Sequence, residues 1–262
     1  MPPITRHLPG AFCWFELATT DQAGAKQFYQ SLFGWGVQDS PIGPTEMYSS
    51  FKLEGRDVAA AYTMRPEQRA AGVPPNWLVY VRVDHVDETA ARVSGAGGKV
   101  VTAPFDVMDL GRMSIVQDPT GAMLAVWEPK HNEGTGLVGE NGTVVWADLI
   151  TPDQTRAAEF YRALFGWQMV VGKSMVAAKP GNYYHIVNGD TFIGGIPPAY
   201  GGPGMPVHWT IYFAVADCQA AIAKATALGA RVVSGPMTIE ARTFPALADP
   251  QGAVFAVVES KK

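Results

Sequence analysis

Two carboxylates each follow a tryptophan by two positions: Glu16 follows Trp14, and Asp148 follows Trp146. Both pairs lie in short apolar runs that are typical of strands, and residues two apart in a strand share one face. An indole ring can stack on a flat aromatic molecule. A carboxylate beside it can hold a proton for acid–base catalysis or attract a cation. The two pairs are therefore candidates for binding or catalysis.

His208 is the histidine best placed to join these groups. It lies two residues before Thr210 in another strand-like run, so these two side chains share a face. A hydrogen-bonded pair of His208 and Asp148 could act in acid–base chemistry or contribute to a metal site, although two ligands make a weak metal site. A ligand-contacting or purely structural histidine is the alternative. The catalytic candidates are thus His208, Asp148 and Glu16.

These candidates recur because the chain repeats itself. Trp14 and Trp146 are 132 residues apart, and so are Trp35 and Trp167. The run Phe-Tyr-x-x-Leu-Phe-Gly-Trp occurs in both copies, and Asp-Pro-x-Gly-Ala comes near the end of each. A repeat of this length indicates a duplicated domain rather than a solenoid. We expect two modules, 1–133 and 134–262, joined through the glycine-rich segment 131–142.

Each copy is expected to contain two units in which a strand and a helix precede further strands. Asp21 and Asp153 are expected to cap the first helix of each copy, and Gly34 and Gly166 to end it. The other helices are expected over 87–95 and 218–228. Hydrophobic patterning predicts strands over 12–18, 47–53, 58–64, 77–83, 99–102, 112–117, 122–128, 144–150, 183–188, 192–197, 208–215, 231–234, 243–248 and 253–259.

Composition excludes several classes of function. The 262 residues carry a net charge of −4 and no run of Lys or Arg, which argues against a nucleic-acid partner. No apolar stretch is long enough to span a membrane, so no membrane partner is expected. The N-terminus lacks the basic and then apolar plan of a secretory signal. We expect a cytoplasmic protein whose partner is a small molecule.

Three motifs together resemble a known superfamily. Leu-x-Thr-x-Asp is followed by Phe-Tyr-x-x-Leu-Phe-Gly-Trp and later by Asp-Pro-x-Gly-Ala before a last strand, in both copies. This pattern resembles the vicinal oxygen chelate superfamily, which includes glyoxalase I, bleomycin-resistance proteins and extradiol dioxygenases. It is most similar to the tandem, two-module members of actinobacteria. The resemblance implies an α+β fold of two tandem glyoxalase-like modules, each of two βαβββ units with curved mixed sheets around a cleft.

Metalloenzymes of this superfamily hold a divalent ion with His, Gln or Glu side chains from four strands. The resemblance places the ligand positions at Trp14, Leu78 and Ala125 in the first copy, and at Trp146, Thr210 and Ala256 in the second. The remaining position lies near Ala60 or Tyr62, and near 193–195. An indole offers only a donor N–H, and Leu and Ala offer no ligand atom. We therefore expect a metal-free member that uses no cofactor.

The same alignment, combined with strand alternation, predicts which residues line the clefts. They form an apolar, aromatic surface with a few polar groups, which is typical of small-molecule pockets. Arg112 could clamp an anionic group or pair with Asp109. For Trp14 and Trp146 the alternative is packing between sheets. The expected ligand contacts are Trp14, Asn76, Tyr80, Arg112, Trp127, Trp146, Thr210 and Tyr212.

These observations favour a metal-free glyoxalase- or bleomycin-resistance-like protein that binds a small, aromatic metabolite or antibiotic. The alternative is an enzyme, either a glyoxalase-like lyase or isomerase, or a ring oxygenase or hydroxylase of secondary metabolism. Either cleft could be the one that is used. The modules could pair within one chain, giving a pseudo-dimeric monomer, or across a homodimer.

Overall fold

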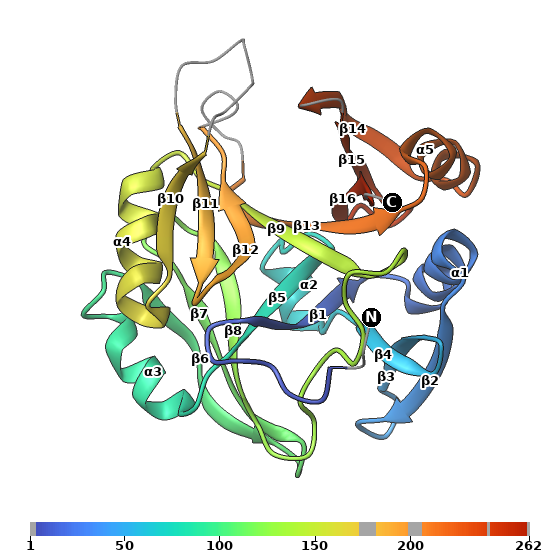
Figure 1. The fold of residues 1–262 in the computed structure, drawn as a ribbon. Coiled ribbons are helices and arrows are strands. Elements are labelled where there is room, and N and C mark those ends of the chain that lie inside the picture. Colours follow the sequence, from blue (N-terminus) through green and yellow to red (C-terminus); the bar gives the residue numbers. More distant parts are fainter. Residues whose placement is uncertain (1–3, 173–181, 199–205, 240–241, 261–262) are drawn as a thin grey trace.

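Two eight-stranded mixed sheets, one in each copy of the repeat, form the frame of the molecule (Figure 1). In the computed structural model, residues 4–172, 182–198, 206–239 and 242–260 are described. In the first sheet the order is β2 (Gly36–Pro41), β3 (Met47–Leu53), β4 (Arg56–Thr63), β1 (Phe12–Thr19), β5 (Asn76–Arg82), β8 (Met123–Pro129), β7 (Gly111–Gln117) and β6 (Lys99–Val107).

The second sheet repeats this order. Its strands are β10 (Gln168–Gly172), β11 (Tyr183–Asn188), β12 (Thr191–Ile196), β9 (Val144–Ile150), β13 (His208–Val215), β16 (Val254–Glu259), β15 (Arg242–Ala248) and β14 (Arg231–Ile239). The central pair in each sheet, β1 with β5 and β9 with β13, is antiparallel. Their outer neighbours β4, β8, β12 and β16 join in parallel. This confirms the α+β fold of two tandem modules with mixed sheets.

The helices are α1 (Gln22–Phe33), α2 (Pro66–Ala70), α3 (Val86–Val93), α4 (Gln154–Phe165) and α5 (Cys218–Ala227). The caps of α1 and α4 are as predicted, since Asp21 and Asp153 accept hydrogen bonds from backbone N–H groups of the first turn. Gly34 and Gly166 end these helices in the left-handed conformation, with φ of 74° and 73°. Glycine adopts this conformation without the steric cost that a side chain adds.

Three elements were missed by sequence patterning: β2, β10 and α2. The strand β2 is a sheet edge whose residues are almost all exposed, so it lacks the apolar alternation that identifies strands. The helix α2 is short and buries no residue, so it has no apolar face to recognise.

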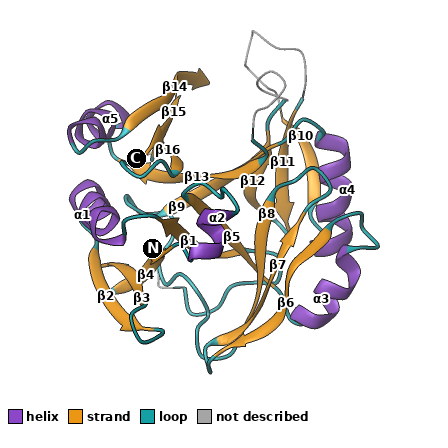
Figure 2. Cartoon of the chain, turned by 180° about the vertical axis from the view of Figure 1, so that it is seen from behind, coloured by secondary structure: helices purple, strands orange, loops and turns teal. Residues whose placement is uncertain are grey.

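The two modules pack back to back around one shared core. Trp77 of β5 and Phe213 of β13 meet edge to face at 5.6 Å between ring centroids. In both views α1 lies beside α5, and α3 lies beside α4, so helices of different modules pair (Figure 2). The outer strands of each sheet, which we call its arms, curve away from this core (Figure 1). We call the face that each sheet turns away from the core its concave face.

The repeated motifs join the modules. The Tyr29 hydroxyl of α1 donates to Asp249 Oδ2 in the second module at 3.0 Å. Tyr161 of α4 donates to Asp118 Oδ2 in the first module at 2.9 Å. Each aspartate belongs to the Asp-Pro-x-Gly-Ala motif, and its other oxygen accepts backbone N–H groups of that turn. The modules therefore pair within one chain.

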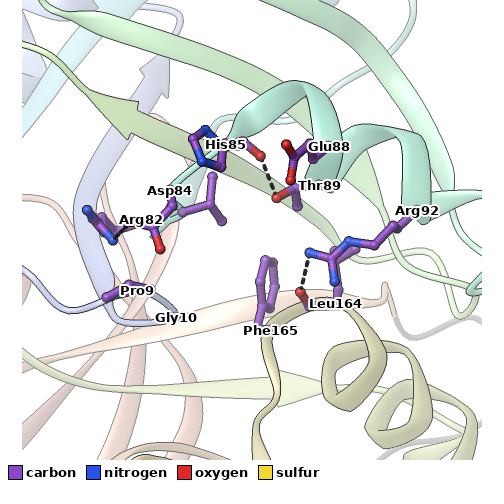
Figure 3. A pocket seen from close by; sticks show the side chains of 11 residues that line it. Pro9, Gly10, Arg82, Asp84, His85, Glu88, Thr89, Arg92, Leu164 and Phe165 are labelled. Carbon is purple, nitrogen blue, oxygen red and sulfur yellow. Dashed lines mark hydrogen bonds and ion pairs between the residues drawn. The ribbon is translucent and has the colours of Figure 1, made fainter.

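Two hollows lie where the modules meet, at equivalent places in the two copies. The larger, of about 260 Å³, lies between α3, the end of α4 and the segment 9–10 (Figure 3). Arg92 donates across it to the Leu164 carbonyl at 3.1 Å. The smaller, of about 180 Å³, lies between α1, α5 and the segment 141–142. Neither is lined by a sequence-predicted site residue, and their equivalence indicates that both arise from the pairing of the modules.

No helix among the described residues is both long enough and apolar enough to span a membrane.

Candidate small-molecule site on the concave faces

The concave face of the first module holds a carboxylate between two tyrosines. Glu16 of β1 accepts hydrogen bonds from Tyr80 at Oε1, 2.9 Å, and from Tyr48 at Oε2, 2.8 Å. The Trp14 indole N–H donates to the Tyr48 hydroxyl at 2.8 Å. Three strands supply this cluster: β1, β5 and β3. The strand β5 pairs directly with β1, and β3 is joined to β1 through β4.

The second module builds the same cluster with a shorter acid. Asp148 of β9 accepts from Tyr183 at 2.6 Å and from the Trp146 indole at 2.9 Å through Oδ1. Its Oδ2 accepts from Tyr212 at 2.8 Å. Asp148 is only 7% exposed. Both oxygens of each carboxylate are thus held by aromatic donors.

Burial changes the acidity of these groups. It raises the pKa of Glu16 and of Asp148 above the ordinary values, and the tyrosine hydrogen bonds offset this only in part. Burial and the neighbouring carboxylate raise the pKa of Tyr48, Tyr80 and Tyr183, so these phenols keep their protons. In each cluster the carboxyl group is therefore the member that can gain and lose a proton, as acid–base chemistry requires.

The predicted pair of His208 and Asp148 is wrong within the described residues. His208 Nε2 instead lies 3.0 Å from the Thr210 hydroxyl, and its Nδ1 lies 2.9 Å from the Pro206 carbonyl. The register explains this difference. Thr210 lies opposite Asp148, whereas His208 lies opposite Ile150, two residues further along the strand.

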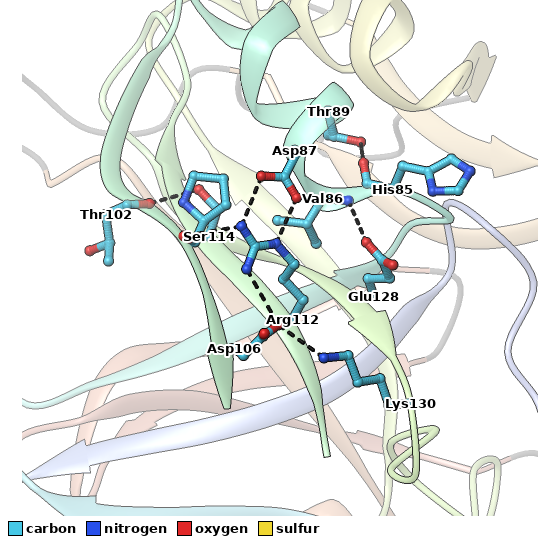
Figure 4. Close-up of polar contacts among 11 residues, drawn as sticks. His85, Val86, Asp87, Thr89, Thr102, Asp106, Arg112, Ser114, Glu128 and Lys130 are labelled. Carbon is cyan, nitrogen blue, oxygen red and sulfur yellow. Dashed lines mark hydrogen bonds and ion pairs between the residues drawn. The ribbon is translucent and has the colours of Figure 1, made fainter. Parts of the chain in front are cut away.

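Arg112 lies on the helix side of its sheet rather than on the concave face (Figure 4). Its Nε and Nη2 donate to both oxygens of Asp87 in α3, at 2.6 and 2.8 Å, and its Nη1 lies 3.3 Å from Asp106. Both predictions for Arg112, a clamp for an anionic ligand and a pair with Asp109, are therefore wrong. Arg112 instead ties β7 and β6 to the first turn of α3.

Two other predicted contacts use their polar atoms locally. The Trp127 indole donates to the Asn132 carbonyl at 2.9 Å, and the ring is 6% exposed. The Asn76 amide donates to the Pro74 carbonyl at 2.8 Å, at the start of β5. The structure thus brings Trp14, Glu16 and Tyr80 together, and likewise Trp146, Asp148, Thr210 and Tyr212.

The resemblance to the vicinal oxygen chelate superfamily implies a divalent ion, and the residues present do not fit one. Strand pairing brings the expected ligand positions together. Glu16, which shares a face with Trp14, pairs with Leu78 and with Ala60. Tyr80 pairs with Trp14 on one side and with Ala125 on the other. None of Trp14, Leu78, Ala60 and Ala125 has a ligand atom. The described residues contain no group of three or more His, Cys, Asp or Glu that could hold an ion.

Sequence reasoning missed Tyr48, Tyr183 and His185. Tyr183 and His185 alternate along β11, and the His185 ring packs 4.9 Å from Tyr183 and 5.9 Å from Trp146. The register shows that Ser50 occupies the place of His185 in the first module, because Ser50 pairs with Ala60 and His185 with Gly195. The available signal was the tyrosine that both copies have in this strand, Tyr48 and Tyr183. It was obscured because these two tyrosines are not separated by the 132 residues that separate Trp14 from Trp146.

Comparison with protein families identifies both modules. Residues 11–126 match the Glyoxalase/Bleomycin resistance protein/Dioxygenase superfamily, and residues 144–258 match a Glyoxalase-like domain. The chain is 42% identical over 263 residues to CFP32 of Mycobacterium tuberculosis (strain CDC 1551 / Oshkosh), whose name suggests a glyoxylase. That match covers 99% of this chain and 98% of CFP32. The anthracycline biosynthesis protein DnrV of Streptomyces peucetius is 35% identical, with 99% of this chain and 96% of DnrV covered.

Solved structures share the fold at low sequence identity. The Mn(II)-bound glyoxalase from Novosphingobium aromaticivorans superimposes with a TM-score of 0.65 at 15% identity, covering 97% of this chain and 83% of the other. The 2,3-dioxygenase LapB from Pseudomonas sp. KL28 gives 0.65 at 11% identity, covering 98% and 94%. At these identities the likeness concerns the fold alone.

Proposed function

Because the chain belongs to the glyoxalase/bleomycin resistance protein/dioxygenase superfamily, we propose that it binds a small aromatic molecule on a concave face without a metal ion. One observation carries this proposal. Where the superfamily's ligand set is expected, each module instead has a carboxylate that accepts hydrogen bonds from two tyrosines. A tryptophan indole donates to the Tyr48 hydroxyl in the first module, and to Asp148 itself in the second. Indole and phenol rings supply stacking surface, and hydroxyl groups supply orientation.

The relatives agree with a natural product as the ligand. DnrV is named for anthracycline biosynthesis, so a metabolite or antibiotic of secondary metabolism is a consistent class. The acids add selectivity, because a carboxylate under the rings favours a ligand with a positive charge or a hydrogen-bond donor.

The surroundings of Asp148 support a second candidate function, that of a glyoxalase-like lyase or isomerase that transfers a proton. The 2.6 Å bond between Tyr183 and Asp148 joins a phenol to a buried carboxyl whose pKa burial raises. Such a pair can accept a proton from a bound substrate and return it at another atom. Catalysis by this cluster would require Asp148, and the variant Asp148→Asn would then bind substrate without turnover.

Native mass spectrometry of the untagged chain, before and after dialysis against a chelator, tests the metal-free proposal. We expect the same mass in both samples, apart from any organic adduct. We also expect no stoichiometric uptake of Zn²⁺ or Mn²⁺ when each is added back. A stoichiometric ion that the chelator removes would contradict the proposal. An organic adduct would identify the ligand class by its mass.

A further inference from the structure

We propose that the ligand binds on the concave face of the second module. We further propose that His185 recognises it through a hydroxyl or carbonyl oxygen carried on its aromatic ring. This inference rests on the proposed function, because it specifies which face binds and which chemistry selects the ligand. It follows from three differences between the two faces.

The first difference is that the first module fills its own concave face. Trp14, Tyr80 and Trp127 are 6%, 4% and 6% exposed, and they pack with Met113 and Ala125 into a small apolar cluster separate from the main core. The rings that could stack on a ligand are therefore already covered by side chains of this module. Glu16, Tyr48 and Leu78 lie at the edge of this cluster and keep part of their surface exposed.

The second difference is a cover formed by the chain itself. The N-terminal segment and the linker after β8 cross between the arms of the first sheet (Figure 1). They are bonded to each other, since the Ile4 N–H donates to the Gly136 carbonyl at 3.1 Å and His7 Nε2 lies 2.9 Å from the Thr135 carbonyl. The linker also docks on β1, where the Thr135 N–H donates to the Cys13 carbonyl at 2.8 Å.

The second module leaves its stacking rings accessible. Trp146 and Tyr212 are partly exposed, in contrast to their buried counterparts Trp14 and Tyr80. Val258 takes the place of Trp127, as the strand registers show, so this position carries no ring. Asp148 is buried beneath the rings, and its hydrogen bonds to Tyr183 and Tyr212 hold it in place.

The third difference is His185, whose place in the first module is taken by Ser50. Its ring continues the aromatic row, 5.4 Å from Phe192, which is 54% exposed. The Nδ1 atom of His185 is buried and has no hydrogen-bond partner among the residues that the structure describes. Buried polar atoms without a partner are costly and rare in folded proteins. A ligand that supplies an oxygen here would remove that cost.

The two available tautomers define the ligand chemistry. A protonated Nδ1 donates to a carbonyl or hydroxyl oxygen, and an unprotonated Nδ1 accepts from a hydroxyl group. The neighbouring rings Trp146 and Phe192 favour a flat aromatic frame around that oxygen. The ligand class is therefore an aromatic ring bearing a hydroxyl or carbonyl oxygen.

Calorimetric titration with naphthol and with naphthalene separates stacking from oxygen recognition. We expect the wild-type chain to bind naphthol more tightly than naphthalene. His185→Phe keeps the ring but removes Nδ1, so naphthol affinity should fall about tenfold while naphthalene affinity stays unchanged. Ser50→Ala, at the equivalent place in the first module, is the matched control and should leave both affinities unchanged.

Every other outcome contradicts one part of the proposal. If His185→Phe leaves the preference for naphthol intact, or if Ser50→Ala reduces it, the second-module site is wrong while aromatic binding stands. If the wild-type chain binds neither probe, the proposed function fails and this inference fails with it. The nitrogen NMR shift of His185 Nδ1 in the wild-type chain provides a test without mutation. It should move on adding naphthol and stay in place with naphthalene, and no movement with naphthol would refute the contact.

Discussion

At the scale of single residues, Glu16 and Asp148 are the groups for which we propose a chemical role. Each accepts hydrogen bonds from two tyrosines, Asp148 also accepts one from Trp146, and burial disfavours the charged form of both. Two opposing effects therefore set their acidity. Burial is the larger, and it raises both pKa values. The consequence is a dependence of stability on pH that can be measured.

A carboxyl whose pKa is raised in the folded state contributes most to stability at low pH. This contribution is complete below the ordinary pKa and is lost as pH rises through the raised pKa. Asp148→Asn cannot titrate, so it should remove the corresponding decline in the free energy of unfolding. Urea denaturation of wild-type and variant chains between about pH 4 and about pH 8 measures the difference.

The gap between Asp148→Asn and wild type should change in favour of the variant as pH rises. A gap that does not change with pH would show that burial does not raise the pKa of Asp148.

At the scale of elements, adjacent strands make room for the cluster through small residues. Gly195 of β12 pairs with Asp148, and a Cβ at this position would overlap the Tyr183 hydroxyl group. The corresponding residue of the first module is Ala60, opposite Glu16. The two clusters are therefore similar in chemistry and different in the space that their strands leave.

Gly195→Ala should displace Tyr183 from Asp148 and destabilise the chain by about 1–3 kcal/mol, the usual cost of overpacking. It should also weaken binding of an aromatic probe to the second module. The matched control is Gly36→Ala in strand β2, where an added Cβ makes only an ordinary contact at 3.7 Å. Urea denaturation and probe titration check both variants. Equal stabilities would show that Tyr183 can lie elsewhere at no cost.

At the scale of the whole molecule, the two modules depend on each other. Aromatic rings of both modules contribute to one core, and the Tyr29 and Tyr161 hydroxyls bond to buried aspartates of the opposite module. Removal of a hydroxyl leaves a buried carboxylate oxygen without its partner. A missing partner of this kind costs more than the hydrogen bond itself gains.

Tyr29→Phe and Tyr161→Phe should each lower the free energy of unfolding by about 1–3 kcal/mol. Denaturation followed by tryptophan fluorescence and by circular dichroism should give one coincident transition, because the modules share a core. Tyr184→Phe is the control, since the Tyr184 hydroxyl makes no hydrogen bond within the described residues and its loss should cost little. Two separate transitions would contradict the shared core.

The sequence by itself determined the duplication, the element types and the helix ends. These features depend on local periodicity and on caps such as Asp21 and Gly34, whose effects extend over a single turn. Strand alternation also placed Trp14 and Glu16 on one face, since that geometry needs no knowledge of neighbouring strands. The edge strand β2 escaped prediction because exposed residues carry no periodic signal.

Only the tertiary structure decided which groups meet. Asp148 bonds to Tyr183 rather than His208, and Arg112 bonds to α3 rather than to the concave face. These partners depend on strand register, and a shift of one residue reverses the face of a side chain. The difference between a covered first face and an accessible second face also depends on where the linker docks, through contacts between distant segments that local sequence patterns do not encode.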